Sequence, residues 1–249
     1  MSRAPSALKV DLATLPHVWR VDDLAPAKAV VGTGHSKLDA ALPGGGWPTG
    51  SLIEILQRMP AHHVWTLLAP ALIAVLQEQS GPVVLVGAPW QPFGPSLSAQ
   101  GLSVERLLCV HGDQPGLRLW ATEQAVRCAH VAAVMAWLPH ARNEELRRLH
   151  LAAQQHERLL FVFRSLRSRH ESSPAAVRLQ VQGIEEIEVE ILKRRGPPLL
   201  EPVRLAAGSR RLTALLQARR NSRTARSTSD RSAAVPGRSH VLDRTAAIQ

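Results

Sequence analysis

Residues 57–66 occupy the position at which a nucleotide-hydrolysing protein would carry its phosphate-binding loop. They follow a glycine-rich turn at 43–50 and a short apolar stretch, and they lead into a segment of helical spacing. A phosphate loop reads G-x-x-x-x-G-K-[ST], because glycines let consecutive backbone N–H groups surround the anion and the lysine binds the β- and γ-phosphates. The residues present, QRMPAHHVWT, include neither glycine nor lysine. We therefore expect no triphosphate binding at this junction.

Two other groups that nucleotide hydrolysis requires are also missing. In proteins with a phosphate loop, an aspartate at the end of a central apolar strand holds Mg²⁺, but the apolar run 131–138 has no carboxylate and carries Trp137 near its end. A water-activating carboxylate is expected after the second strand, yet no Asp or Glu lies between Glu78 and Glu105. Each electrostatic contribution of this kind is worth about 3 kcal/mol of barrier. We therefore expect no enzymatic activity, no catalytic residue and no bound cofactor.

No other group of side chains in the sequence indicates catalysis or metal binding. His62 and His63 are adjacent, so they lack the i,i+4 spacing that places two imidazoles on one helical face. Cys109 and Cys128 are the only cysteines and lie in apolar surroundings, which predicts two buried thiols in a reducing compartment. No apolar run reaches the about 20 residues of a membrane-spanning helix, and the first residues lack the apolar segment of a signal peptide. We expect a cytoplasmic protein without a metal ion or a membrane partner.

Short apolar runs alternate with segments of helical spacing between residues 51 and 163. The predicted strands are 51–56, 82–87, 107–110, 131–138 and 159–163, and the predicted helices are 62–79, 117–129 and 143–157. Apolar strands separated by helices are typical of a parallel sheet covered on both faces. Residues 176–181 and 184–192 instead alternate apolar and polar side chains around Gly183, which predicts an antiparallel hairpin at one edge. The predicted fold class is α/β, with a mostly parallel sheet and helices on both faces.

The charge of the chain is concentrated near its C-terminal end. The formal net charge is +10. Residues 1–191 carry 17 basic and 17 acidic side chains, whereas residues 192–249 carry 13 basic and 3 acidic ones. From about residue 210 the chain is rich in Arg, Ser, Thr and Ala, and this composition buries too little surface to offset the entropy of ordering it. We predict an N-terminal segment at 1–30, a globular domain at 31–209 and a disordered basic tail at 210–249.

The stretch VGTGHSKLDAALPGGGWPTGSLIEI, residues 31–55, resembles the entry into the core of the recombinase RecA. The shared pattern is T-G-x-x-x-L-D-x-x-L-x-x-G-G-[LW]-P-x-G-x-[IL]-x-E-I, and the order of predicted strands and helices agrees with that fold as far as Phe163. The resemblance implies a RecA-like core at 31–209. Because the phosphate loop is missing, this core keeps the frame of a nucleotide site without its chemistry.

The chain is more narrowly similar to the ImuA family, RecA-like accessory proteins of bacterial mutagenesis cassettes. The similarity rests on PHVWR at 16–20, on the segment 163–179 and on LKRRGPP at 192–198. It implies a non-catalytic adaptor in damage-induced, error-prone translesion DNA synthesis during the SOS response. The implied partners are a Y-family-like polymerase homologue (ImuB-like) and an error-prone replicative-type polymerase, with RecA and non-specific DNA as further candidates.

Two other functions are open to a RecA-like chain. A cell-division inhibitor resembling SulA also uses a RecA-like shape without a phosphate loop, and it would bind a tubulin-like GTPase. An active recombination ATPase is disfavoured by the three missing groups. The basic C-terminal region and the KRRGPP segment favour the adaptor over the division inhibitor.

Basic residues in two regions are candidates for binding nucleic acid or a partner. In a RecA-like fold the loop after the fifth strand lies on the DNA-facing side, so the resemblance points to Arg164, Arg167 and Arg169. Further along the chain the guanidinium groups suit phosphate geometry. The candidates there are Lys193, Arg194, Arg195, Arg210, Arg211, Arg219, Arg220, Arg223 and Arg226. The alternatives are a merely soluble loop and a tail that aids solubility or docks on an acidic partner.

Overall fold

The computed structural model describes residues 29–59, 63–183 and 186–206 of the 249-residue chain. The chain divides into two units, Met1–Ala207 and Gly208–Gln249, and every described residue lies in the first. The predicted tail at 210–249 and nearly all of the predicted N-terminal segment lie outside the described residues, so both boundaries stay predictions. None of the helices in the described ranges has the length and apolarity needed to cross a membrane.

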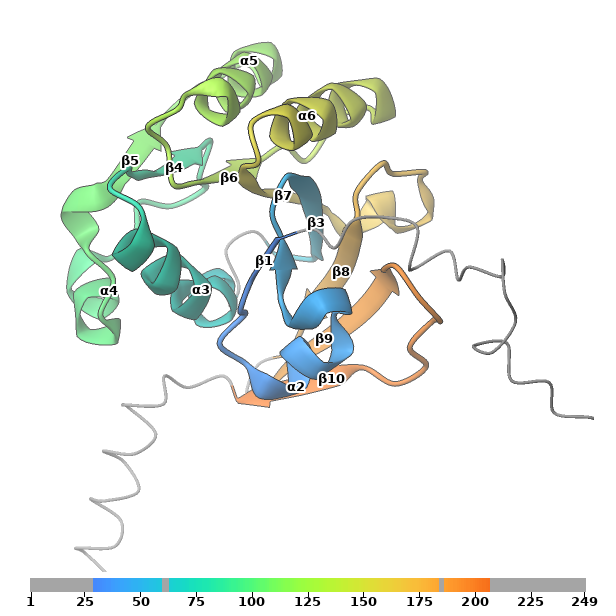
Figure 1. The fold of residues 1–249 in the computed structure, drawn as a ribbon. Coiled ribbons are helices and arrows are strands. Elements are labelled where there is room, and N and C mark those ends of the chain that lie inside the picture. The colour runs from blue at the N-terminus through green and yellow to red at the C-terminus, as the bar shows by residue number, and fades with distance from the viewer. Residues whose placement is uncertain (1–28, 60–62, 184–185, 207–249) are drawn as a thin grey trace, which may run out of the picture. The chain divides into compact units, whose positions relative to one another are not determined.

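An eight-stranded sheet forms the centre of the described domain (Figure 1). Its strands lie in the order β10-β9-β8-β3-β7-β6-β4-β5. The pairs from β8 to β5 are all parallel, whereas β9 runs antiparallel to both β8 and β10. In chain order the strands are β3 (Ser51–Gln57), β4 (Val83–Val86), β5 (Leu107–Val110), β6 (Ala133–Trp137), β7 (Leu159–Ser165), β8 (Val177–Gln182), β9 (Glu186–Lys193) and β10 (Val203–Ala206). The predicted α/β class with a mostly parallel sheet is confirmed.

Helices cover both faces of this sheet. The helices are α2 (Ser36–Ala41), α3 (Val64–Glu78), α4 (Gly94–Gln100), α5 (Pro115–Arg127) and α6 (Asn143–Gln155). Short 3-10 turns lie at Pro43–Gly45, Val104–Arg106 and Leu166–His170, the last labelled η4. Figure 1 shows α3 and α4 on one side of the sheet and α5 and α6 on the other. A small antiparallel pair, β1 (Val30–Val31) with β2 (Trp47–Pro48), precedes β3.

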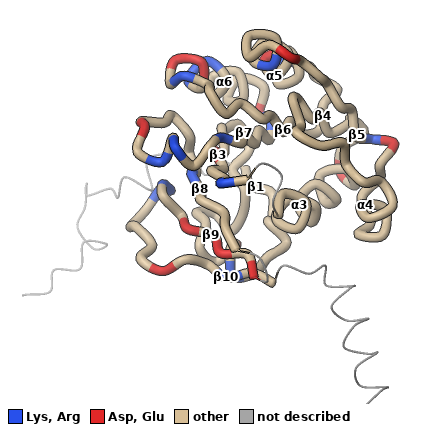
Figure 2. Tube along the Cα trace, turned by 180° about the vertical axis from the view of Figure 1, so that it is seen from behind, with Lys and Arg blue, Asp and Glu red and all other residues tan. Residues whose placement is uncertain are grey.

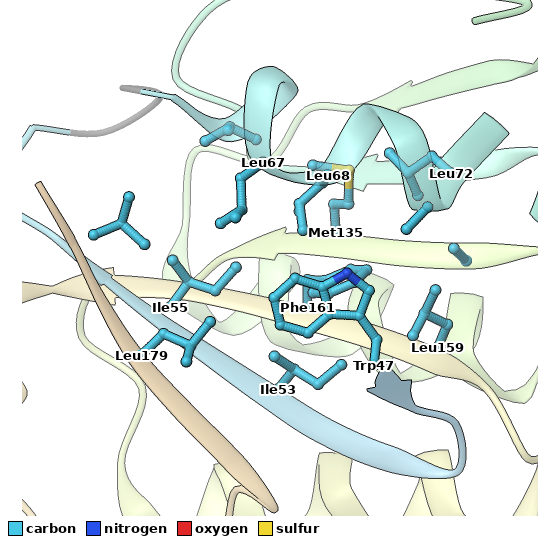
Figure 3. Packing of buried hydrophobic residues seen from close by; sticks show 14 of the residues in the cluster. Trp47, Ile53, Ile55, Leu67, Leu68, Leu72, Met135, Leu159, Phe161 and Leu179 are labelled. Carbon is cyan, nitrogen blue, oxygen red and sulfur yellow. The ribbon is translucent and has the colours of Figure 1, made fainter. Parts of the chain in front are cut away.

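The strand residues alternate between two buried clusters, one on each face. Ile53, Ile55 and Phe161 pack under α3, where the Trp47 and Phe161 rings meet edge to face at 5.5 Å (Figure 3). On the other face Leu52 and Leu160 pack with residues of α5 and α6. Because both faces of the central strands are covered, their sequences are apolar throughout rather than alternating. Burial of this apolar surface is the main stabilising contribution to the fold.

The antiparallel hairpin is confirmed, but it does not form the edge of the sheet. β8 and β9 pair as predicted, and β10 then adds to β9 as the outermost strand. β10 was not predicted, because its four residues, VRLA, are too few to show alternation clearly. Only two of them, Val203 and Leu205, are buried, as expected for one face of an edge strand.

The residues that carry the resemblance to RecA are structural in this chain. The Thr33 backbone N–H donates to Asp39 Oδ1 at 2.7 Å, which closes the turn ahead of α2. Gly34 has a φ of 78°, and a β-carbon there would lie 2.3 Å from Cβ of Pro70 in α3. Gly45 has a φ of 79°, a region that favours glycine. The motif thus fixes how the chain enters β3 and packs beside α3.

Candidate functional site

The junction that would hold a phosphate loop joins β3 to α3. β3 ends at Gln57, and Arg58 and Met59 follow as exposed residues. Residues 60–62, including His62, lie outside the described residues. His63 has a φ of 58° and its Nε2 lies 2.6 Å from the Gly183 carbonyl oxygen. The described part of the junction therefore presents a cation and an apolar side chain at the start of α3.

The positions of the two other missing nucleotide-site groups lie at the same edge of the sheet. Trp137 is the last residue of β6, and Gly87 follows β4. The Trp137 ring stacks on Phe163 of β7, with centroids 4.5 Å apart and planes 15° from parallel. Its indole Nε1 is buried without a hydrogen-bond partner among the described residues. Trp137 is thus a packing residue at the position where a phosphate-loop protein carries its metal-binding aspartate.

Two adjoining hollows open at this edge, where the parallel strands end. One has a volume of about 490 Å³ and is lined from β3, β4, β6 and β7 by Gln57, Arg58, 87–89, Arg118, Trp137, 139–140 and 163–165. The other, of about 400 Å³, is lined by Pro115, Arg118, Leu119, 137–142 and Glu145. We call the two together the carboxyl-edge cleft. Crevices at the carboxyl ends of parallel strands are the common ligand sites of open α/β sheets.

A buried charge network lies beside the cleft, on the face covered by α5 and α6. Glu54 of β3 is fully buried, and its carboxylate lies 3.0 Å from both Arg164 Nη1 and Arg178 Nε. Arg164 also donates to the Ala141 carbonyl and to Glu171, both at 2.7 Å. Two guanidinium groups around one carboxylate are tolerated here because Glu171 and backbone carbonyls accept from their terminal nitrogens, although Arg164 Nε is buried without a hydrogen-bond partner among the described residues.

This network corrects the predicted role of Arg164. The residue lies inside β7 rather than in a surface loop, and its side chain is 3% exposed. Its guanidinium is committed to Glu54, Ala141 and Glu171, so it has no surface to offer to a phosphate. Arg178 was not a candidate, yet it binds the carbonyls of Ser168, Arg169 and Glu171 and so holds the η4 turn in place.

Arg169 is also held within the domain, whereas Arg167 is exposed. Arg169 Nη1 donates to Glu190 Oε2 of β9 at 2.7 Å. The hydrogen bond from Arg169 lowers the pKa of the Glu190 carboxyl, and the one from Arg164 lowers the pKa of Glu171. Arg167 sits on the same turn with an exposed side chain. Of the three predicted loop arginines, Arg167 is the one that the structure leaves at the surface.

The basic residues at the end of β9 and directly after it, 193–195, line a separate groove of about 620 Å³. Its walls include Val30, Pro43, Ala175, Lys193, Arg194 and Arg195. Lys193 Nζ donates to the Ser173 carbonyl at 2.8 Å, and the Arg194 guanidinium donates to the carbonyls of Ala41 and Pro197. These contacts anchor the KRRGPP segment to the domain. The remaining predicted candidates, Arg210, Arg211, Arg219, Arg220, Arg223 and Arg226, lie outside the described residues.

Basic and acidic positions are interspersed along the described chain (Figure 2). Within the described ranges, no group of three or more His, Cys, Asp or Glu side chains is arranged to hold a metal ion. Cys128 is exposed, contrary to the expected buried thiol, because it follows the last turn of α5. Cys109 is half-buried in β5, and burial raises the pKa of its thiol.

Some functional candidates were missed at the level of sequence. Arg118 of α5 lines both hollows, and its Nε donates to the Gly112 carbonyl. In the sequence Arg118 is an isolated arginine in a weakly amphipathic helix. Such a pattern does not show which strands the arginine faces. Glu54 did carry a signal, since a lone carboxylate within an apolar strand requires a buried partner. The register that pairs it with Arg178 could not be read from the sequence.

Comparison with known proteins finds partial similarity to a bacterial cell division inhibitor. No family model matches the chain. Over 89 residues the chain is 35% identical to the cell division inhibitor SulA of Edwardsiella piscicida, a match that covers 36% of this chain and 53% of that protein. The chain therefore spans about half the length of this curated relative. The crystal structure of SulA from Pseudomonas aeruginosa matches with 26% identity and a TM-score of 0.39, covering 46% of this chain and 97% of that one. The sequence identity to the Edwardsiella piscicida protein bears on the SulA alternative rather than on the ImuA family.

Proposed function

We propose that this protein acts by binding another protein, and that the partner is the tubulin-like GTPase of bacterial cell division. The observation that carries the proposal is the 35% identity to the division inhibitor SulA over 89 residues. An inhibitor of this kind with a RecA-like shape would block assembly of the GTPase by occupying its surface. The damage-induced SOS response is the setting that both the SulA and the ImuA resemblances imply.

The residues at the carboxyl edge of the sheet support a protein-binding function rather than nucleotide hydrolysis. Arg58 follows β3 where a phosphate loop would begin, and the aromatic Trp137 ends the strand that would carry a metal ligand. A hydrolytic site would need a lysine, a metal-holding aspartate and a water-activating carboxylate. The sequence supplies none of the three at the corresponding positions. A non-catalytic role is therefore part of the proposal.

A second candidate is the ImuA-like adaptor of translesion synthesis. It is favoured by the resemblance at 16–20, 163–179 and 192–198, which is distributed along the chain. The Arg194 guanidinium anchors the last of these segments to the Ala41 carbonyl beside α2. In this function the partners would be a polymerase homologue of the Y family and an error-prone replicative-type polymerase rather than a GTPase.

One pair of measurements separates the two candidates. The purified full chain is added to the tubulin-like GTPase of the same organism, and GTP-driven assembly is followed by light scattering, with an unrelated protein of similar size as control. We expect assembly to stop as the concentration of the chain approaches that of the GTPase, because each bound chain blocks one GTPase molecule. We expect this inhibition to occur without ATP. In parallel, the chain is mixed with the polymerase homologue and analysed by size-exclusion chromatography. If assembly is unaffected and the chain forms a stable complex with the polymerase homologue, the adaptor function is correct and the division-inhibitor function is wrong.

A further inference from the structure

The carboxyl-edge cleft lies between the N-terminal ends of two helices. Pro115 begins α5 and lines the cleft, as does Arg142, the residue that precedes α6. Trp137, Pro139 and His140 line both hollows and connect them. The N-terminus of a helix carries a partial positive charge from its aligned peptide dipoles. The backbone around the cleft therefore already favours a negatively charged group.

The side chains around the cleft add to this positive charge. Arg58, Arg118 and Arg142 line it from three different segments. Among the described lining residues Glu145 supplies the one carboxylate, and that carboxylate accepts a hydrogen bond from the Arg142 backbone N–H at 2.7 Å. Arg164 also contributes to the wall, but its charge is offset by Glu54 and Glu171. The remaining cations face the cleft without a matching anion among its described lining residues.

Large apolar side chains stand exposed next to these cations. Trp90 is 73% exposed and follows Pro89, which lines the cleft. Met59, next to Arg58, is 58% exposed. Tryptophan, methionine and arginine are the residue types that protein interfaces enrich, and exposed tryptophans beside a cleft are typical anchors.

We propose that the carboxyl-edge cleft binds an acidic segment of a protein partner. The carboxylates of that segment enter the cleft between Arg58 and Arg118, and its apolar side chains cover Met59 and Trp90, which adjoin the lining residues Arg58 and Pro89. The inference rests on the proposed protein-binding function and names the surface and the chemistry of its partner. Phosphates of a nucleic acid would meet the same cations, and Trp90 can stack on a base, so the test includes a single-stranded oligonucleotide as the competing occupant.

The test uses the full chain and a labelled synthetic peptide of alternating glutamate and leucine residues, followed by fluorescence anisotropy. Arg58→Glu reverses an exposed charge at the cleft, and Arg147→Glu, on an exposed position of α6 away from the lining, is its matched control. Trp90→Ser removes an exposed apolar residue next to the cleft, and Leu151→Ser, 62% exposed on α6, is the corresponding control. All four positions are at the surface, so each variant is expected to fold. Circular dichroism checks that they do.

We expect the acidic peptide to bind wild type and both controls alike, and Arg58→Glu and Trp90→Ser to weaken binding by at least about fivefold. A peptide with lysine in place of glutamate should not bind. Equal affinity for all variants, or for both peptides, would overturn the proposal. So would binding of single-stranded oligothymidine that competes with the peptide and is lost in Arg58→Glu, because the site would then be a nucleic-acid site.

The same variants separate this inference from the proposed function. If wild type and Arg58→Glu block assembly of the GTPase equally, the cleft assignment fails while the division-inhibitor function stands. If the peptide data hold but wild type does not affect assembly, the cleft stands and the partner is another protein with an acidic segment.

Discussion

At the scale of single residues, Glu54 of β3 lies at the centre of the buried charge network. Its carboxylate is fully buried and faces two guanidinium groups, each 3.0 Å away. Through Arg178 it is connected to the carbonyls of the η4 turn, which carries the exposed Arg167. One carboxylate in the central strand therefore couples β3 to a surface turn far away in sequence.

Replacing Glu54 by Gln should destabilise the domain strongly. The change leaves Arg164 and Arg178 buried around a neutral amide, and breaking a buried ion pair by removing one partner costs about 3–5 kcal/mol. Urea unfolding monitored by circular dichroism measures the loss. Glu78→Gln, at an exposed position at the end of α3, is the control and should change the free energy of unfolding little. A loss as small as that of the control would mean that the network does not stabilise the fold.

The pair of Arg169 and Glu190 makes stability depend on pH in a defined direction. The hydrogen bond from Arg169 lowers the pKa of Glu190 below its ordinary value of 4.5. A carboxyl with a lowered pKa in the folded state stabilises the fold above its ordinary pKa, and this contribution is lost as the pH falls through the folded-state pKa. Below pH 4.5 the wild type should therefore lose stability more steeply than Arg169→Gln.

The measurement is a series of urea unfolding curves at pH values on either side of 4.5. Arg167→Gln is the matched control, since it neutralises an exposed arginine of the same turn. Its pH profile should follow that of the wild type. Parallel profiles for the wild type and Arg169→Gln would show that the ion pair does not form in solution.

At the scale of elements, the glycine-rich turn at 43–50 illustrates what backbone geometry requires. Gly45 has a φ of 79°, although a β-carbon there would meet no atom within 4 Å. Gly45→Val should therefore destabilise through backbone strain alone, by about 1–3 kcal/mol. Gly116→Ala is the control, because Gly116 lies in α5 with open space around it and alanine favours a helix. Thermal unfolding should place Gly45→Val below the wild type and Gly116→Ala at or above it. An unchanged melting temperature for Gly45→Val would refute the assigned turn.

Most elements could be predicted because their signals are local. β3, β5 and β7 are apolar runs bounded by turn residues, and α3 and α6 have helical length and spacing. The missed elements are short: α2, α4 and β10 have six, seven and four residues, and β1 and β2 have two each, which are too few to establish a period. The turn after β7 was correctly recognised as polar, but its start was placed too early, so Arg164 was assigned to the surface.

The candidate site was predictable only in part, for a different reason. The absence of a phosphate loop can be read from residues 57–66 without any knowledge of the fold. The carboxyl-edge cleft, in contrast, is formed by side chains from distant segments, such as Arg58 and His140. Which of these meet depends on the strand order β3-β7-β6-β4, and sequence spacing alone does not give that order.

At the scale of the whole molecule, the basic C-terminal region has a testable role of its own. Residues 192–249 carry 13 basic and 3 acidic side chains, while residues 1–191 are balanced. Deleting residues 210–249 should reduce affinity for DNA of any sequence and flatten its dependence on salt, because each neutralised phosphate releases counterion. The described strands end at Ala206, so the truncated chain should keep its fold.

Binding is measured by fluorescence anisotropy with a labelled duplex over a series of salt concentrations. The polymerase homologue and the tubulin-like GTPase are titrated against the same truncated chain. If DNA binding is unchanged while binding to either protein disappears, the region is a docking arm rather than a nucleic-acid contact.

We propose that this α/β domain lacks nucleotide chemistry and works by binding a protein. Isothermal titration calorimetry of the purified chain with ATP in Mg²⁺ buffer tests it most directly. Residues 57–66 lack the glycines and lysine of a phosphate loop, and the strand β6 ends in Trp137 rather than in a metal ligand. We expect no saturable heat of ATP binding. A saturable isotherm with a micromolar dissociation constant that depends on Mg²⁺ would contradict it.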